Sequence, residues 1–422
     1  MLNVSDDFLG LIGLASAGAS GAEFSGTDIN WDKTLHLAAE QSVIPLLGCV
    51  LSRNPLIMCP DEVREYLSGS LRIMSSMNMI RKQRMLNLIQ ELRNSGFQIR
   101  VIKGYVIAEG YAYPESRSSV DVDILIPPEQ EKAVCDYLRR KEFIIEERSL
   151  TSHHTVCKHR KYGVVEVHVN LYDELVEEIW FQNRIKDLVQ EHSIDVAVTD
   201  GMIPTLGYTD HFLFLTLHMI KHFISDGMGL GMMLDIGLFY RKYRAYIDMD
   251  RFWKMLDVLN YSTVIACVMR VLKEYGGFSE FDFARTKVIT NTQINLLLSD
   301  VETGGRMGIN EQEARMDSAY AYNRLIMLKT RNKLSYYSYM LRWKAKATAR
   351  AIFPTREHLK MRYPYTQGKP LTLPIAWLQR FIAGGVRGLI RDKTRSQIRT
   401  NSSALNKVSE KRLDLFRKLE ML

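Results

Sequence analysis

Residues 120–126 read VDVDILI, alternating apolar and acidic side chains, and end at a pair of prolines. This period of two predicts a β-strand that stops before the prolines. Successive strand side chains point to opposite faces, so Asp121 and Asp123 project together while the intervening apolar residues enter a core. Two carboxylates on one face repel each other unless a cation lies between them. Oxygen ligands of this kind suit Mg²⁺, and replacing one acid by Asn should relieve the repulsion.

A second alternating segment supplies a third acid. Residues 164–169 (VVEVHV) predict a strand with Glu166 and His168 on one face and valines on the other. If this strand lies beside the first, Glu166 completes a three-carboxylate cluster. Such clusters can hold two metal ions about 3.5–4 Å apart for phosphoryl transfer. The alternative is a solvated acidic face, since an isolated D-x-D pair is common in strands.

Phosphate-binding candidates precede the acidic strand. Residues 97–102 (FQIRVI) predict a strand and residues 103–113 have helical composition, with Lys103-Gly104 at the junction. Glycine allows backbone N–H groups to approach a phosphate closely. Arg117 follows on a loop from which it could reach the same phosphates.

Helical segments flank this unit. We expect helices over residues 28–53, 61–94 and 129–141, a strand over 143–147, and apolar helices from 208 to about 275. The fold class is therefore α/β (α+β), with a mixed sheet in a core flanked by N-terminal and C-terminal helical regions. The expected division is an N-terminal helical region (1–95), the α/β core (96–199), a helical domain (200–329) and a basic C-terminal region (330–422).

Charge is distributed unevenly along the chain. Residues 330–422 contain 21 Lys and Arg against 5 Asp and Glu, whereas the whole chain has a net charge of only +8. This basic region is a candidate surface for an anionic membrane, a nucleic acid or another polyanion. Within it, residues 375–390 have the spacing of an interfacial helix or of an ordinary amphipathic helix.

No apolar run reaches the roughly 18–20 residues of a transmembrane segment, and the first twenty residues lack the features of a secretory signal. The five cysteines are odd in number, widely spaced and without a CxxC pair, which predicts reduced thiols and a cytoplasmic location.

The combination of these segments can be assigned to a family. Residues 101–126 (VIKGYVIAEGYAYPESRSSVDVDILI), followed by VVEVHVN, resemble the nucleotidyltransferase superfamily that shares the DNA polymerase β fold. More narrowly, they are similar to a large, poorly characterised bacterial family often found beside surface-polysaccharide genes. In that family a KG helix start, an Arg, a D-x-D strand and an acidic strand recur in this order. Residues 32–47 and 218–235 are similar to its flanking helices, so the resemblance spans about 30–240.

The resemblance implies Mg²⁺-dependent transfer of a nucleoside monophosphate from an NTP such as ATP to an unidentified acceptor hydroxyl or phosphate. Two Mg²⁺ ions would be held by Asp121, Asp123 and Glu166, which are also the implied catalytic residues. The nucleotide would contact Lys103, Gly104, Tyr105 and Arg117. The superfamily turn usually has Gly or Ser after its first Gly, whereas here Tyr105 follows Gly104.

Two other functions stay open, and Tyr105 favours the first of them. One is a catalytically inactive nucleotidyltransferase-fold module that docks to an anionic membrane or polymer. The other is a toxin-like enzyme that modifies tRNA or protein, which the basic region permits.

Several polar residues are further candidates for facing the substrate. His218 and His222 share one predicted helix face, and as a zinc pair they would need a third ligand. Asp235 is either directed at the cleft or is a helix-terminal acid. His168 completes this set of possible substrate-facing residues. The histidines at 153, 154 and 159 either reach a phosphate or lie on an exposed strand or loop.

Overall fold

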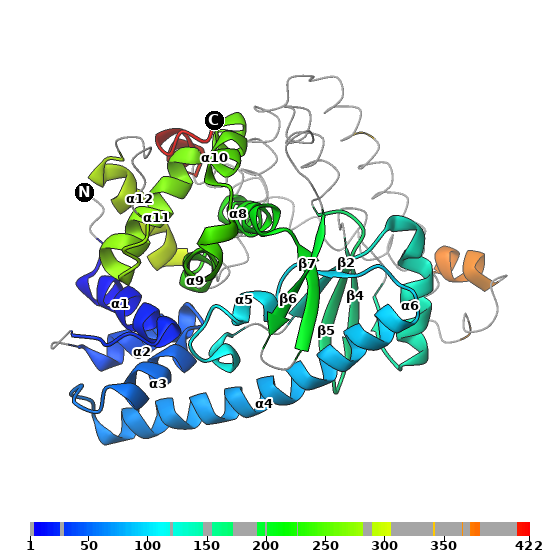
Figure 1. Cartoon of the computed structure of the whole chain (residues 1–422), viewed down its shortest axis with the longest axis horizontal. Coiled ribbons are helices and arrows are strands. Elements are labelled where there is room, and N and C mark those ends of the chain that lie inside the picture. Colours follow the sequence, from blue (N-terminus) through cyan, green and yellow to red (C-terminus); the bar gives the residue numbers. More distant parts are fainter. Residues whose placement is uncertain are drawn as a thin grey trace.

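The computed structural model describes residues 4–25, 29–118, 121–146, 154–171, 192–198, 201–225, 227–281, 289–304, 341, 365, 372–379 and 412–422. One long helix, α4 (Asp61–Asn94), runs beneath both a helical assembly and a sheet (Figure 1). It begins after Pro60 with acidic residues in its first turn, and the chain leaves it through Gly96 at φ 85°. The predicted helix over 61–94 is thus confirmed.

The main sheet has five strands in the order β1-β2-β5-β4-β3, with β2 and β5 parallel and the other pairs antiparallel. These strands are β1 (Arg100–Val101), β2 (Asp121–Leu125), β3 (Ile144–Ile145), β4 (His154–His159) and β5 (Gly163–His168). The sheet is therefore mixed, as predicted. The strands expected over 97–102 and 143–147 are each only two residues long. The helix α6 (Glu131–Arg140) connects β2 to β3 and packs on β3.

A two-stranded hairpin that the sequence patterns did not indicate adjoins this sheet. Its strands are β6 (Ser193–Val198) and β7 (Gly201–Leu206). The Thr205 hydroxyl donates to the Val101 carbonyl oxygen at 2.6 Å, which ties the hairpin to β1. Burial lowers the pKa of His211 to about 4, so this side chain is neutral where its Nε2 contacts the Ile102 carbonyl oxygen.

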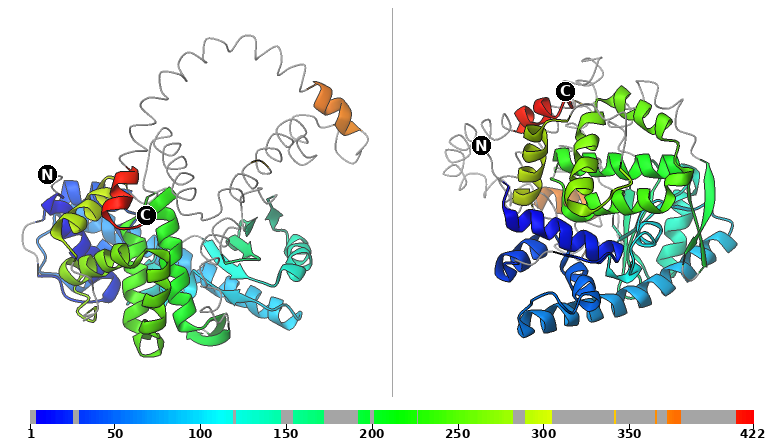
Figure 2. Two further views of the ribbon diagram at one scale, coloured as in Figure 1. Left: turned by 90° about the horizontal axis from the view of Figure 1, so that it is seen from above. Right: turned by 60° about the vertical axis from the view of Figure 1, so that its left-hand side comes forward.

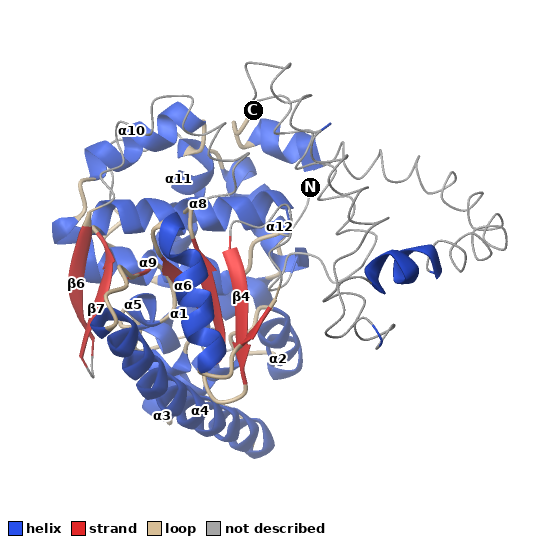
Figure 3. Ribbon diagram, turned by 90° about the vertical axis from the view of Figure 1, so that its right-hand side faces the viewer, coloured by secondary structure: helices blue, strands red, loops and turns tan. Residues whose placement is uncertain are grey.

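Eight further helices of the described part of the chain form the assembly on the other side (Figure 2). They are α1 (Asp6–Ser20), α2 (Trp31–Glu40), α3 (Ile44–Arg53), α8 (Tyr208–Ser225), α9 (Leu230–Tyr243), α10 (Met249–Leu259), α11 (Ser262–Gly276) and α12 (Asn291–Gly304). Helices α1 and α3 cross closely at Gly18, where an added Cβ would lie 2.0 Å from the Leu46 carbonyl oxygen. Figure 3 shows these helices behind the sheet.

The expectation of one helix over residues 28–53 is wrong, because the chain breaks between α2 and α3. Ser42 has a positive φ of 56°, and Pro45 lies in the first turn of α3. The buried Gln41 amide stabilises the break by donating to the Val301 carbonyl oxygen and accepting from the Leu230 N–H, at 2.7 and 2.8 Å. Both partners are distant in sequence, so local periodicity could not reveal the interruption.

The last described residues, 412–422, pack on the helical assembly. Phe416 is fully buried, with its ring 5.8 Å from that of Phe223, and Arg412 forms an ion pair with Asp300. Most of the basic region and most of the helix expected over 375–390 lie outside the described residues. No helix among the described residues has both the length and the apolar character needed to span a bilayer.

Candidate active site

Three carboxylates converge on one face of the sheet. Strands β2 and β5 are parallel neighbours, and their register places Asp123 opposite Glu166. Asp121 lies two residues before Asp123 and therefore projects from the same face. One carboxylate oxygen from each of Asp121, Asp123 and Glu166 lies within 4.8 Å of the others. This donor set consists only of oxygen, which is the ligand type that Mg²⁺ prefers.

The ammonium group of Lys103 lies between two of these acids. Its Nζ is 3.2 Å from Asp121 Oδ2 and 3.5 Å from Asp123 Oδ2. Burial alone would lower the pKa of Lys103, but the charges of Asp123, Asp121 and Glu166 outweigh burial and raise it. The expected cation between the two carboxylates is therefore supplied, in part, by a side chain of the protein itself.

Asp123 is the most enclosed acid, with a side chain only 1% exposed. Its Oδ1 is 2.9 Å from His168 Nε2, and the Glu166 carboxylate is 3.6 Å from the same nitrogen. Burial raises the pKa of Asp123, but Lys103 and His168 together hold it well below its usual range. Burial lowers the pKa of His168, while its hydrogen bonds with Asp123 and Glu166 outweigh this and raise it. Asp123 is consequently ionised at neutral pH.

Gly104 adopts φ 79°, a left-handed conformation that favours glycine, and α5 (Tyr105–Ala108) follows it. The long helix expected over 103–113 is thus reduced to four residues. The chain then turns at Gly110, where a Cβ would be 3.2 Å from the Leu238 carbonyl oxygen. Burial raises the pKa of Tyr105 to about 12, so its hydroxyl stays protonated.

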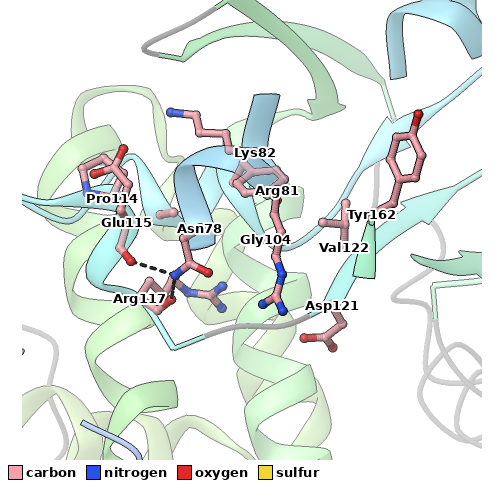
Figure 4. Close-up of a pocket in the computed structure, with 12 residues that line it drawn as sticks. Asn78, Arg81, Lys82, Gly104, Pro114, Glu115, Arg117, Asp121, Val122 and Tyr162 are labelled. Carbon is pink, nitrogen blue, oxygen red and sulfur yellow. Dashed lines mark hydrogen bonds between the residues drawn. The ribbon is translucent and has the colours of Figure 1, made fainter. Parts of the chain in front are cut away.

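A small pocket of about 30 Å³ lies beside this turn (Figure 4). Its lining includes residues of α4 together with Gly104, Tyr105 and Asp121. Arg81 of α4 is a lining cation that the sequence patterns did not indicate. The neighbouring Asn78 amide donates to the carbonyl oxygens of Glu115 and Arg117 at 2.7 and 3.2 Å. Helix α4 therefore positions the loop that precedes the acidic strand.

Arg117 and Asp235 form a largely enclosed bidentate ion pair, with side chains 9% and 15% exposed. Arg117 Nε and Nη2 each lie 2.8 Å from an Asp235 oxygen, and the Tyr111 hydroxyl donates to Oδ1 at 2.7 Å. Asp235 lies within α9 rather than at a helix end. The pair links the loop before β2 to the helical assembly, which is a role the sequence did not indicate for either residue. Arg117 also lines the small pocket and a second, larger cavity. Its role in binding a nucleotide stays a prediction.

A larger cavity of about 360 Å³ lies between the sheet and helices α8 and α9. The sheet side contributes Lys103, Asp121, Glu166 and His168, and the helices contribute His218, Lys221, His222 and Asp235. Burial, with the charge of Lys103, lowers the pKa of His218 well below its usual range, so its imidazole is neutral. Apolar residues such as Leu46, Leu215 and Met219 complete the wall. The cavity is large enough for a small polar ligand with an apolar part.

The mixed sheet with acids on neighbouring strands is the fold of an α/β nucleotidyltransferase. Residues 27–277 match the profile of a family described as uncharacterised nucleotidyltransferases, which covers more than half of the sequence, and the chain belongs to this family. The resemblance inferred from residues 101–126 is confirmed; its association with polysaccharide genes stays a prediction. Neither the search of curated proteins nor that of solved structures gave a match.

Proposed function

We propose that this protein transfers a nucleoside monophosphate from an NTP, in a Mg²⁺-dependent reaction, to an acceptor hydroxyl or phosphate bound in the larger cavity. The observation that carries the proposal is the convergence of Asp121, Asp123 and Glu166, of which Asp121 and Glu166 line that cavity. Membership of a nucleotidyltransferase family supports the same reaction class.

The donor chemistry of the three acids fits Mg²⁺. All three offer oxygen, and Asp121 and Glu166 are partly exposed toward the cavity, which leaves room for water and phosphate ligands. The short distances from Lys103 to Asp121 and Asp123 indicate that this position favours positive charge. Bound there, Mg²⁺ would neutralise negative charge that develops on the phosphates.

In the proposed reaction, the acceptor oxygen forms a bond to the α-phosphorus while the bond from that phosphorus to the bridging oxygen breaks. Pyrophosphate leaves with the electron pair of the broken bond. Glu166 accepts the proton of an acceptor hydroxyl, because it is the partly exposed acid on β5. Lys103, which lines the larger cavity, and Arg81, which lines the small pocket beside Gly104, provide positive charge for the triphosphate.

The decisive experiment incubates the purified full-length protein with each α-labelled NTP and Mg²⁺, and measures pyrophosphate release and label transfer in the presence of small-molecule acceptor pools. Asp121→Asn should abolish both signals. Asp136→Asn, which removes an exposed acid of α6, is the matched control and should leave them unchanged. Equal signals from Asp121→Asn and from the unaltered protein would reject the proposal.

The second candidate is a catalytically inactive module that binds anionic surfaces. One observation favours it: Lys103 already compensates the acids without any metal ion. Calorimetric titration with Mg²⁺ separates the candidates, since the inactive module predicts no binding that depends on Asp121. In either case we propose a cytoplasmic location, consistent with the five free thiols, and an anionic partner for residues 330–422.

A further inference from the structure

A second potential metal-binding group lies on the same face of the sheet. His154 of β4 is the direct cross-strand partner of His168 on β5. Glu166 lies two residues before His168 and therefore projects from the same face. Facing side chains on adjacent strands have Cβ atoms about 4.5–5.5 Å apart. The backbone alone thus brings two imidazoles and one carboxylate together.

The distances between donor atoms suit a small four-coordinate cation. His154 Nε2 and His168 Nε2 lie 3.5 and 3.6 Å from Glu166 Oε2. Bonds of about 2.0–2.1 Å at the tetrahedral angle separate two ligand atoms by roughly 3.3 Å, whereas right angles would bring them to roughly 2.9 Å. The observed separations are therefore close to the tetrahedral value and need only a slight contraction.

The chemistry of the donors differs from that of the three-carboxylate cluster. Imidazole nitrogen suits Zn²⁺ and neighbouring first-row transition metals, whereas carboxylate oxygens alone suit Mg²⁺. We propose that His154, His168 and Glu166 form a separate site for a divalent transition-metal ion of the Zn²⁺ type. The inference is tied to the proposed function because Glu166 belongs to both groups and His168 contacts Asp123.

The position of this site leaves one coordination place open. All three residues line the larger cavity, and His154 and Glu166 are each just over one-fifth exposed. Three protein ligands and an open place are the arrangement of catalytic rather than structural zinc sites. Lys221 also lines the cavity and adds positive charge near His154. The fourth ligand is therefore water or an anionic group of a molecule bound in the cavity.

Metal binding at this site requires one local rearrangement. His168 Nε2 now lies 2.9 Å from Asp123 Oδ1, and a cation at Nε2 would replace this hydrogen bond. Asp123 keeps its contact with Lys103 in that case. The new site and the Lys103 ion pair can thus exist together.

Co²⁺ provides a direct spectroscopic test, because four-coordinate Co²⁺ with nitrogen ligands has intense visible absorption bands. Titration of the metal-free full-length protein should give these bands at one equivalent of Co²⁺, and Zn²⁺ but not Mg²⁺ should remove them. His154→Ala should weaken Co²⁺ binding at least tenfold. His36→Ala, which removes an exposed histidine of α2, is the matched control and should have no effect.

His154→Gln repeats the test with a side chain of similar size, and circular dichroism confirms that each variant is folded. Bands that persist in both His154 variants, or that are absent from the unaltered protein, would overturn the inference. Asp121→Asn distinguishes this site from the catalytic proposal. If that variant keeps the Co²⁺ bands but the unaltered protein neither binds Mg²⁺ nor releases pyrophosphate, only the proposed function fails.

Discussion

Two enclosed lysines of this protein differ in what surrounds them. Lys82 of α4 is 2.9 Å from Glu109, and Lys242 lies 3.9 Å from the same carboxylate, so two lysines face this one acid. Lys103 instead faces Asp121 and Asp123, with Glu166 nearby, so acids outnumber the lysine. The first group pairs a single carboxylate with two lysines and borders the small pocket of about 30 Å³. The second lies on a cavity and has negative charge in excess, which is the condition for binding a further cation.

The largest expected effect concerns the acids around Lys103. Asp123→Asn should reduce label transfer by about a thousandfold or more, because it removes a carboxylate from the proposed Mg²⁺ site. It should also lower the melting temperature, since Lys103 and His168 lose a buried anionic partner. Asp121→Asn should reduce transfer as much with a smaller loss of stability, because Asp121 is 27% exposed. A fully active Asp123→Asn variant would contradict the proposed role of the acids around Lys103 as Mg²⁺ ligands.

The next prediction compares the two lysines directly. Lys82→Met and Lys103→Met should each destabilise the metal-free protein by about 3–5 kcal/mol, because each leaves a buried carboxylate without its nearest cation. Mg²⁺ should restore the melting temperature of Lys103→Met, since a divalent ion can replace the ammonium group there. It should not restore that of Lys82→Met. Thermal unfolding with and without Mg²⁺ measures the melting temperature of each variant. An equal change on adding Mg²⁺ would show that the two lysine sites do not differ in their ability to bind a cation.

A smaller effect is expected at the Arg117–Asp235 pair. Arg117→Ala should cost about 2–4 kcal/mol, because it leaves Asp235 enclosed and without its bidentate partner. The double variant Arg117→Ala/Asp235→Ala should be less destabilised than the sum of the single variants. Denaturant unfolding measures this coupling. If Arg117 also contacts the triphosphate, Arg117→Ala should weaken NTP binding in calorimetry more than Asp235→Ala does.

The smallest expected effect is on pH dependence. The pKa of Asp123 is lower in the folded than in the unfolded protein, so its contribution to stability is present above about pH 4 and is lost as the pH falls further. The pKa of His168 is raised, so its contribution is complete below about pH 6.5 and is lost as the pH rises through the folded value. The free energy of unfolding, measured across this pH range, should fall less at alkaline pH in His168→Gln than in the unaltered protein. If the free energy of unfolding falls equally at alkaline pH in the variant and in the unaltered protein, groups other than His168 cause the fall.

The sequence anticipated the parts of the site that depend on local periodicity. Alternation placed Asp121 with Asp123 and Glu166 with His168, because strand side chains alternate whatever lies beside the strand. The bounds of α4 were predictable because its start and stop signals lie within a few residues of each end. The two-residue strands β1 and β3 were overestimated, since their ends depend on pairing with distant segments.

Local signals did not predict several contacts that define the site. Three of these contacts depend on which elements are neighbours in the fold. They are the position of Lys103 between the acids, the pairing of His154 with His168 and the link between Arg117 and Asp235. The broken helix at Gln41 and the β6–β7 hairpin likewise depend on residues far away in the chain.

The sequence by itself thus determined the nucleotidyltransferase family, the mixed α/β class and the acidic face of each strand. Only the tertiary structure decided that β2 and β5 are adjacent, that an internal lysine compensates their carboxylates, and that two histidines join Glu166 on the same face. The physical reason is the separation along the chain over which each property is set. Side-chain alternation follows from backbone geometry within a few residues, whereas the charges around a buried carboxylate come from segments that only the packing of the whole core brings together.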